Sequence, residues 1–246
     1  LKIIFDKKKG LTLDSIFIGN KKFPICTLKH GELDLIKHGA DFFTGTTIIE
    51  SAETKKISDL IEVEKINFYE IDDNNFKIEV SIEMKQGIKE LKSWTIDTKK
   101  YNIEFDLFLD CPIFIRGIIR VGVITLDKTF ALKNGIIKVK NGNKYYEKIE
   151  LKNSEINQHT SKSLTQSSVS GLGCTNGITK FKNDDFSFKI ELDREKSYPF
   201  VMLQNNKDKF GYLTRLYFSL QELDDTLKES QKNSKYNLNY VVYLKG

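Results

Sequence analysis

Alternation of apolar and polar residues is the pattern that most limits how this chain can fold. Residues 75–85 read NFKIEVSIEMK, so every second side chain from Phe76 to Met84 is apolar and most of those between are charged. The same period of two recurs in residues 101–109, 186–192 and 237–244. This is the period of a β-strand with one buried and one solvated face. The sequence therefore predicts several long, half-buried strands.

Turn signals between these segments favour antiparallel pairing. Gly19-Asn20, Asn134-Gly135 and Asn141-Gly142 are dipeptides that accept the positive φ angles of tight hairpins. The strand–helix–strand alternation of a parallel sheet is missing from the sequence. Residues 112–126 are more continuously apolar and predict a central strand interrupted at Gly117. We therefore expect an all-β fold with two facing antiparallel sheets.

One short helix is predicted near the C-terminus, in residues 219–232. It opens with Ser219 and carries Glu222 three residues later, which is the spacing of a helix-capping box. No linker divides the chain, so we interpret residues 1–246 as a single β-sandwich domain. Because the sequence begins at Leu1 rather than at Met, we expect this domain to be excised from a larger protein.

Charge and cysteine content narrow the classes of partner. The formal net charge is +5, yet the only arginines are Arg116, Arg120, Arg194 and Arg215. Nucleic-acid sites rely on arginine for bidentate contacts, so we expect no nucleic-acid partner. No apolar run approaches the roughly 20 residues of a membrane span, so no membrane partner is expected. Three widely spaced cysteines argue against a disulfide framework and favour a cytoplasmic location.

Motifs for cofactors and metals are weak. Residues 170–177, SGLGCTNG, fail the spacing of a dinucleotide-binding fingerprint, because position 176 is Asn rather than Gly. His30 and His38 are eight residues apart, which is not the spacing of a helical metal pair. We therefore expect no cofactor and no metal ion.

The stretch HGADFFTGTTIIE, residues 38–50, combines aromatic rings with hydrogen-bonding side chains. Proteins bind sugars in this way, with a ring against the C–H face and planar polar groups on the hydroxyls. The alternative is that the carboxylates are solvated and that the rings pack beneath loops. The candidate ligand-binding residues are Asp41, Phe42, Glu50, Trp94 and Arg116.

Turn and strand propensities divide this stretch. Asp41 and Gly45 are turn formers, whereas Thr46 to Ile49 favour a strand, so we expect a loop over residues 41–45 and a strand over residues 46–50. If Asp41 contacts a sugar, Asp41→Ala abolishes binding without a loss of stability. A large loss of stability indicates a structural turn residue instead.

Three segments resemble a known family: residues 37–51, KHGADFFTGTTIIES; residues 167–204, which contain GLGCTNGITKFKNDDFSFKIEL; and residues 215–226, RLYFSLQELDDT. They resemble the galactose-mutarotase-like supersandwich domains of carbohydrate-active enzymes, the C-terminal type found in family-57-like glycoside hydrolases and α-mannosidases. The resemblance implies a large antiparallel β-supersandwich that binds or positions a glycan beside a catalytic domain on the same polypeptide.

Two other functions stay open. The resemblance also includes free-standing aldose 1-epimerases, and for such an enzyme the weak catalytic candidates are His38 as acid and Glu50 as base. Those epimerases carry a His-Pro-Tyr-type motif, whereas no His of this sequence precedes Pro, so their catalytic residues are not transferred. The third possibility is a structural or interaction domain whose aromatic residues are all buried.

Overall fold

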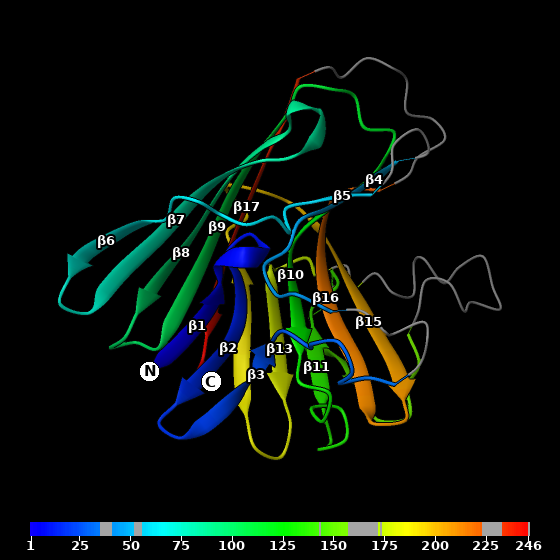
Figure 1. Ribbon diagram of the computed structural model, residues 1–246. Coiled ribbons are helices and arrows are strands. Elements are labelled where there is room, and N and C mark those ends of the chain that lie inside the picture. The colour runs from blue at the N-terminus through cyan, green and yellow to red at the C-terminus, as the bar shows by residue number, and fades with distance from the viewer. Residues whose placement is uncertain are drawn as a thin grey trace.

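Two facing antiparallel sheets make up the computed structural model, as the alternating sequence predicts (Figure 1). The structure describes residues 1–34, 41–51, 56–142, 144–156, 172, 174–222 and 233–245. Within these ranges, helical structure is limited to short 3-10 turns, η1 (Lys7–Lys9) and η3 (Lys85–Gly87). No helix there is long and apolar enough to cross a membrane.

The larger sheet has nine strands in the order β12-β11-β13-β14-β17-β9-β8-β7-β6. Its longest strands are the four neighbours from β17 to β7, and shorter strands lie on both sides of them. In sheet order, their bounds are β12 (Glu147–Glu150), β11 (Ile136–Val139), β13 (Ile178–Lys182), β14 (Ser187–Leu192), β17 (Ser234–Tyr243), β9 (Asn102–Cys111), β8 (Lys89–Asp97), β7 (Asn75–Glu83) and β6 (Asn67–Asp72).

The smaller sheet has eight strands, six of them in the order β1-β2-β3-β10-β16-β15. Two further strands extend it, because β4 pairs with β10 and β5 pairs with β4. The bounds are β1 (Lys2–Asp6), β2 (Thr12–Ile18), β3 (Lys21–Cys26), β10 (Gly117–Leu126), β16 (Gly211–Gln221), β15 (Phe200–Asp208), β4 (Ile48–Ser51) and β5 (Ile57–Ser58).

Aromatic side chains join the two sheets at the centre of the core. Trp94, Phe105, Tyr240 and Phe218 are at most 1% exposed, and their successive ring centroids lie 4.6 to 4.9 Å apart. Gly122 lies beneath this stack with a φ of +57°, and a Cβ there would come within 2.9 Å of Phe105 and Tyr240. Only glycine fits so close an approach in that conformation. The register shift of β10 between Val121 and Ile124 falls at this glycine.

A buried ion cluster lies at one end of the core and is formed by Lys92, Asp59 and Glu90. All three side chains are 0% exposed. The Lys92 ammonium contacts both carboxylates, 3.2 Å from that of Glu90, and donates to the Gly10 carbonyl at 2.9 Å. The second Asp59 oxygen accepts from the Thr46 hydroxyl and the Thr47 amide at 2.7 and 2.9 Å. Through Asp59, the cluster therefore links the segment that precedes β4 to strand β8.

Titration of the buried ion cluster reflects both burial and pairing. Burial raises the pKa of Glu90 to about 7, against the lowering effect of the Lys92 charge. Burial alone would lower the pKa of Lys92, but the charges of Asp59 and Glu90 outweigh it and raise that pKa above its ordinary value.

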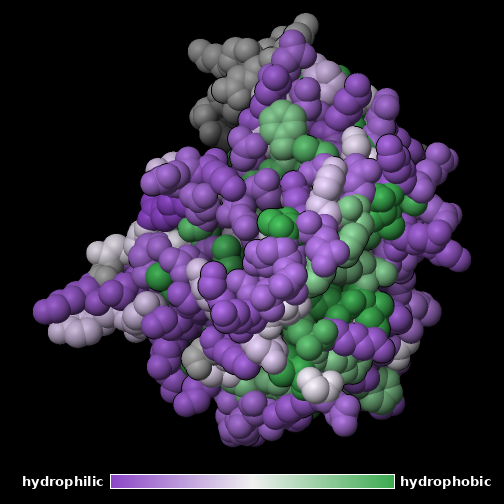
Figure 2. Space-filling view, turned by 90° about the vertical axis from the view of Figure 1, so that its left-hand side faces the viewer, coloured by the Kyte–Doolittle hydropathy of each residue, from purple (hydrophilic) through white to green (hydrophobic). Residues whose placement is uncertain are grey.

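β6 forms one edge of the nine-stranded sheet and projects from the body beside β7 (Figure 1). Viewed from this side, the molecule shows a band of hydrophobic surface among hydrophilic residues (Figure 2). Phe68, Tyr69 and Ile71 of β6 are exposed. Glu70 and Asp72 lie between and beside them, and charges of this kind limit pairing of an edge strand with another chain.

The turn predictions had mixed outcomes. Gly19-Asn20 joins β2 and β3 as a two-residue hairpin, as predicted. Asn134-Gly135 and Asn141-Gly142 are not two-residue hairpins, because they lie within the longer connections from β10 to β11 and from β11 to β12. Their positive φ angles at Asn134 and Gly142 serve those longer turns.

The predicted start of the C-terminal helix, at Ser219, is wrong. Residues from Ser219 to Gln221 continue strand β16, because they pair with β10 and β15. The rest of the predicted helix, residues 223–232, lies outside the described residues. The Ser219 hydroxyl does contact the Glu222 carboxylate at 2.5 Å, so the polar pair that suggested a capping box forms at the end of a strand.

Candidate functional site

The outer face of the eight-stranded sheet carries polar side chains on three adjacent strands. Along β16, Leu216 and Phe218 point into the main core, so Arg215, Tyr217 and Ser219 point outward. Across the sheet, Gln204 of β15 lies opposite Arg215, and Arg120 of β10 lies opposite Ser219. We call Arg120, Gln204, Arg215, Tyr217 and Glu222 the arginine cluster.

Hydrogen bonds fix the centre of the arginine cluster. Arg215 Nη1 donates to the Tyr217 hydroxyl at 2.9 Å, and this hydroxyl donates to Gln204 Oε1 at 2.5 Å. A rigid chain of guanidinium, phenol and amide results, with each planar group held in one orientation.

A bidentate ion pair closes one side of the arginine cluster. Arg120 Nε and Nη2 donate to the two Glu222 carboxylate oxygens at 2.9 and 2.8 Å. The Ser219 hydroxyl donates to the same carboxylate at 2.5 Å. This pair is partly buried, with 11% of the Arg120 side chain and 35% of the Glu222 side chain exposed. Glu222 therefore neutralises and orients Arg120.

Aromatic rings flank both guanidinium groups. The Arg215 guanidinium carbon lies 5.2 Å from the Phe42 ring centroid and 4.9 Å from that of Tyr217. The Arg120 guanidinium carbon lies 5.5 Å from the Tyr217 centroid. Such contacts are attractive and restrict the arginine side chains further.

Four buried polar atoms on this face have no protein hydrogen-bond partner among the described residues. One is Arg215 Nε, a donor on a residue that is 7% exposed, and another is Asn206 Oδ1, an acceptor on a residue that is 4% exposed. The other two are Asp208 Oδ2 on the same face of β15 and Thr125 Oγ1 opposite Arg215 on β10. Asn206 lies two residues from Gln204 on the same face of β15, about 7 Å along the strand. Buried polar groups are normally paired, so the unpaired donor on Arg215 and the unpaired acceptor on Asn206 make this face a candidate site for a polar ligand.

The sequence-based candidates lie in different places. Phe42 is half-buried and reaches the arginine cluster through its contact with Arg215. Asp41 is exposed as expected, but its carboxylate accepts from the His30 backbone amide, as a turn-stabilising residue does. Glu50 is exposed on β4, and Arg116 is exposed just before β10.

Trp94 was wrong as a ligand contact. It is 1% exposed, its ring packs against Phe5 and Phe105, and its indole donates to the Leu11 carbonyl at 3.1 Å. Its charged neighbours in the sequence, Glu90 and Lys92, are buried on the same face of β8, which the alternation rule does not anticipate. His38, the weak acid candidate, lies outside the described residues, and Glu50 is left without a described histidine as its partner in the mutarotase hypothesis.

The strand after the loop also begins later than predicted. β4 starts at Ile48, whereas the side chains of Thr46 and Thr47 are buried, with Thr46 bound to Asp59. Phe43 is likewise buried. Much of the stretch that suggested a sugar site is therefore structural, and of its candidates within the described residues Phe42 contacts the arginine cluster.

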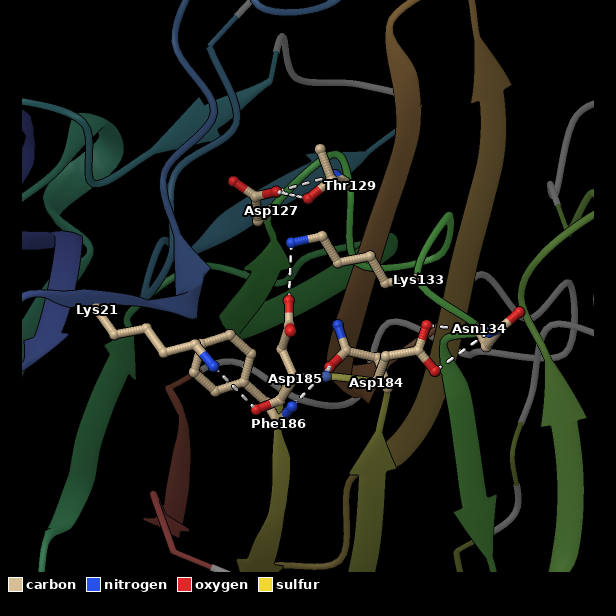
Figure 3. Close-up of polar contacts among 9 residues, drawn as sticks. Lys21, Asp127, Thr129, Lys133, Asn134, Asp184, Asp185 and Phe186 are labelled. Atoms are coloured by element: carbon tan, nitrogen blue, oxygen red, sulfur yellow. Dashed lines mark hydrogen bonds and ion pairs between the residues drawn. The ribbon is translucent and has the colours of Figure 1, made fainter.

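A second polar group borders a cavity of about 180 Å³ between the β2–β3 hairpin and the turns that precede β11 and β14 (Figure 3). Lys133 is paired with Asp185 at 2.8 Å, and Lys21 lies over the Phe186 ring at 4.5 Å. The Asn134 amide donates to both oxygens of Asp184. The polar groups in Figure 3 satisfy one another, so this group is a weaker candidate than the arginine cluster.

Metal-ligand geometry does not occur in the described part of the chain. No group of three or more His, Cys, Asp or Glu side chains gathers there in a way that could hold a metal ion. Cys26 and Cys111 are fully buried, and burial raises the pKa of both thiols. These two cysteines are poor nucleophiles for that reason.

Several solved structures are similar to this chain in fold. The chain is similar to a putative aldose 1-epimerase from Klebsiella pneumoniae, with 10% identity and a TM-score of 0.57 over 99% of this chain and 76% of that one. It is similar to galactose 1-epimerase from Lactobacillus acidophilus, with 7% identity and a TM-score of 0.53 over 98% and 90%. The chain therefore has the fold of these two proteins.

A larger protein contains a similar domain. Heparan sulfate lyase HepC from Pedobacter heparinus matches 96% of this chain with 11% identity and a TM-score of 0.51, and the match spans 30% of the lyase. No protein-family model matches the sequence, and a search of curated proteins finds no match. At these sequence identities, the similarity establishes the fold but does not identify the functional site.

Sequence reasoning missed most of the arginine cluster. Arg120, Gln204, Arg215, Tyr217 and Glu222 are far apart in the chain, and only sheet pairing brings them together. One signal was present: arginine is rare in this lysine-rich chain, and two of its four arginines lie within strands.

Proposed function

We propose that the arginine cluster binds a carbohydrate and that this chain is a carbohydrate-associated β-sandwich domain. The observation that carries the proposal is that an unpaired buried donor on Arg215 and an unpaired buried acceptor on Asn206 lie on the outer face of one sheet. Sugar hydroxyls both donate and accept, so one ligand can satisfy both atoms. Planar guanidinium and amide groups held in fixed orientations suit hydroxyl recognition.

Similarity to a segment of a larger enzyme supports a setting for the domain. HepC is a heparan sulfate lyase by name, and this fold forms less than a third of it. We propose the same arrangement for this chain, with the domain binding or positioning a glycan beside a catalytic domain, as in family-57-like glycoside hydrolases and α-mannosidases.

A free-standing aldose 1-epimerase is the second candidate. Two solved structures named as 1-epimerases match at least 98% of this chain, and the match spans 76% and 90% of their own chains. In this case a carboxylate and a second proton-transfer group must converge on the sugar ring. Glu222 is the carboxylate of the arginine cluster, although its bidentate bonds to Arg120 hold it in a binding geometry.

Two measurements on the purified chain test the proposal and separate the candidates. Isothermal titration and a glycan array measure binding, and the rate at which α-galactose reaches its anomeric equilibrium, followed by NMR, measures epimerase activity. Binding without acceleration supports a binding domain, and acceleration that Glu222→Gln removes supports the epimerase. Failure to bind any sugar in either assay contradicts both. Arg194→Gln is the matched control, because Arg194 also lies against a tyrosine, Tyr198, and outside the arginine cluster.

A further inference from the structure

We propose that the carbohydrate bound at the arginine cluster is acidic and that its anionic group pairs with Arg215. This inference rests on the proposed function and names the class of sugar. The competing reading is that Arg215 binds neutral hydroxyls, as an asparagine or glutamine would.

The charge balance of the arginine cluster favours an anion. Within the arginine cluster, two guanidinium groups face one carboxylate, and Glu222 is committed to Arg120. Asp208 is a further buried carboxylate on this face, but it forms no ion pair with Arg215. None of the ion pairs among the described residues includes Arg215, although it is only 7% exposed. A buried charge without a counter-charge is unfavourable, so its retention is explained if a ligand supplies the opposite charge.

The orientation of Arg215 shows which edge receives the anion. Its Nη1 is engaged by the Tyr217 hydroxyl, whereas Nε has no acceptor among the described residues. In Arg120, the edge formed by Nε and Nη2 holds both oxygens of Glu222. In Arg215, the hydrogen bond from Nη1 to Tyr217 leaves the edge formed by Nε and Nη2 available. This edge can donate two parallel hydrogen bonds to a carboxylate, sulfate or phosphate.

The surroundings of Arg215 strengthen such a pair. The rings of Phe42 and Tyr217 lie about the guanidinium and limit contact with water. Lower water access increases the attraction between opposite charges. Asn206 Oδ1 then remains for a hydroxyl of the same sugar, since an amide oxygen accepts and does not attract an anion.

Matched sugars that differ in charge test the inference by titration calorimetry. Galactose is compared with galacturonate, and glucose with glucose 6-phosphate, and acetate and inorganic phosphate are tested alone. We expect the acidic member of at least one pair to bind about tenfold or more tightly than its neutral partner. We expect a rising salt concentration to lower the affinity for the acidic sugar and to leave the affinity for the neutral sugar unchanged. The two pairs distinguish a carboxylate from a phosphate, and the free anions test whether the sugar ring contributes.

Substitutions of Arg215 test whether this residue causes the preference for the acidic sugar. Arg215→Met removes the charge with a side chain of similar length, and we expect it to abolish the preference for the acidic sugar. Arg215→Lys keeps the charge without the paired edge, so we expect it to lose about tenfold in affinity for the carboxylate, and it serves as the second variant if Arg215→Met does not fold. Arg194→Gln keeps the wild-type preference.

The outcomes separate this inference from the proposed function. Equal affinity for acidic and neutral sugars, with Arg215→Met weakening both alike, overturns the inference and leaves carbohydrate binding intact. Acetate or phosphate binding as tightly as the acidic sugars also overturns it, because the site then recognises an anion rather than a sugar. If no sugar binds in any form, the proposed function itself fails.

Discussion

Two clusters of charged side chains in this molecule differ in whether the protein supplies a counter-charge to the buried cation. The buried ion cluster surrounds the Lys92 ammonium with Asp59, Glu90 and the Gly10 carbonyl. The arginine cluster leaves Arg215 buried with no carboxylate and with an unpaired Nε–H within the described residues. A buried cation that is paired with carboxylates of its own chain serves folding, whereas a buried cation without a counter-charge is explained by a ligand that supplies one. Removing a charge from each cluster should therefore have opposite effects on stability.

The largest effect is expected from Asp59→Asn. The substitution keeps the shape of the side chain but leaves the buried Lys92 ammonium beside Glu90 alone. We expect a loss of about 3 to 5 kcal/mol in the free energy of unfolding, as for other broken buried ion pairs. Urea denaturation at pH 7 measures it. A loss below about 1 kcal/mol would show that the cluster does little for the fold.

The second effect is a pH dependence that comes from Glu90. Its pKa in the folded protein is about 7, above the unfolded value near 4.3, so the folded state binds more protons between these two values. Stability from this group is therefore present below about pH 4 and is lost as the pH rises to about 7. The difference of roughly 2.7 pKa units amounts to about 4 kcal/mol, at 1.36 kcal/mol for each pKa unit.

Glu90→Gln isolates that contribution. Urea unfolding of both proteins across this pH range gives the difference between their free energies of unfolding. We expect wild type to lose stability relative to the variant as the pH rises. A difference that is independent of pH would show that Glu90 is ionised in the folded protein throughout the range.

A smaller effect of opposite sign is expected from Arg215→Met in the absence of ligand. Removal of a buried charge that lacks a carboxylate costs only the hydrogen bond to Tyr217 and the ring contacts. We expect the free energy of unfolding to stay the same or to rise by about 1 kcal/mol while sugar binding is lost. A loss of more than about 2 kcal/mol would assign Arg215 to the fold rather than to a ligand.

The smallest effect is expected at the surface pair in Figure 3. Lys133 and Asp185 are 2.8 Å apart but substantially exposed, and solvent screens such pairs. Lys133→Ala should therefore leave the urea midpoint unchanged within error. A clear decrease would mean that the surface network stabilises the protein as a unit, which would weaken the contrast between exposed and buried charges.

Local patterns in the sequence were sufficient for the sheets. The alternation from Phe76 to Met84 predicts β7 because each residue reports on its own burial. The same rule failed for Glu90 and Lys92, since charged residues on the inner face pair with Asp59 from another part of the chain. The predicted helix failed at Ser219 because pairing with β10 and β15 overrides a local capping signal.

The candidate site was less accessible from the sequence than the fold. Phe42 was identified because an exposed ring among polar neighbours is a local signal. Arg215 and Gln204 are opposite each other only through the register of β15 and β16, and no local pattern gives that register its functional meaning. Asp41 was chosen for its neighbours, but its carboxylate stabilises a turn at His30.

The central claim, that Arg215 belongs to a ligand site, can be observed at the guanidinium itself. The chain has only four arginines, so the ¹H–¹⁵N spectrum of their Nε groups contains at most four signals, each assigned by one substitution. As galacturonate is added, we expect the Arg215 signal to shift most, that of Arg120 to shift less because Glu222 holds it, and that of Arg194 to stay in place. An unmoved Arg215 signal, in a sample where calorimetry shows the sugar to be bound, would contradict the account.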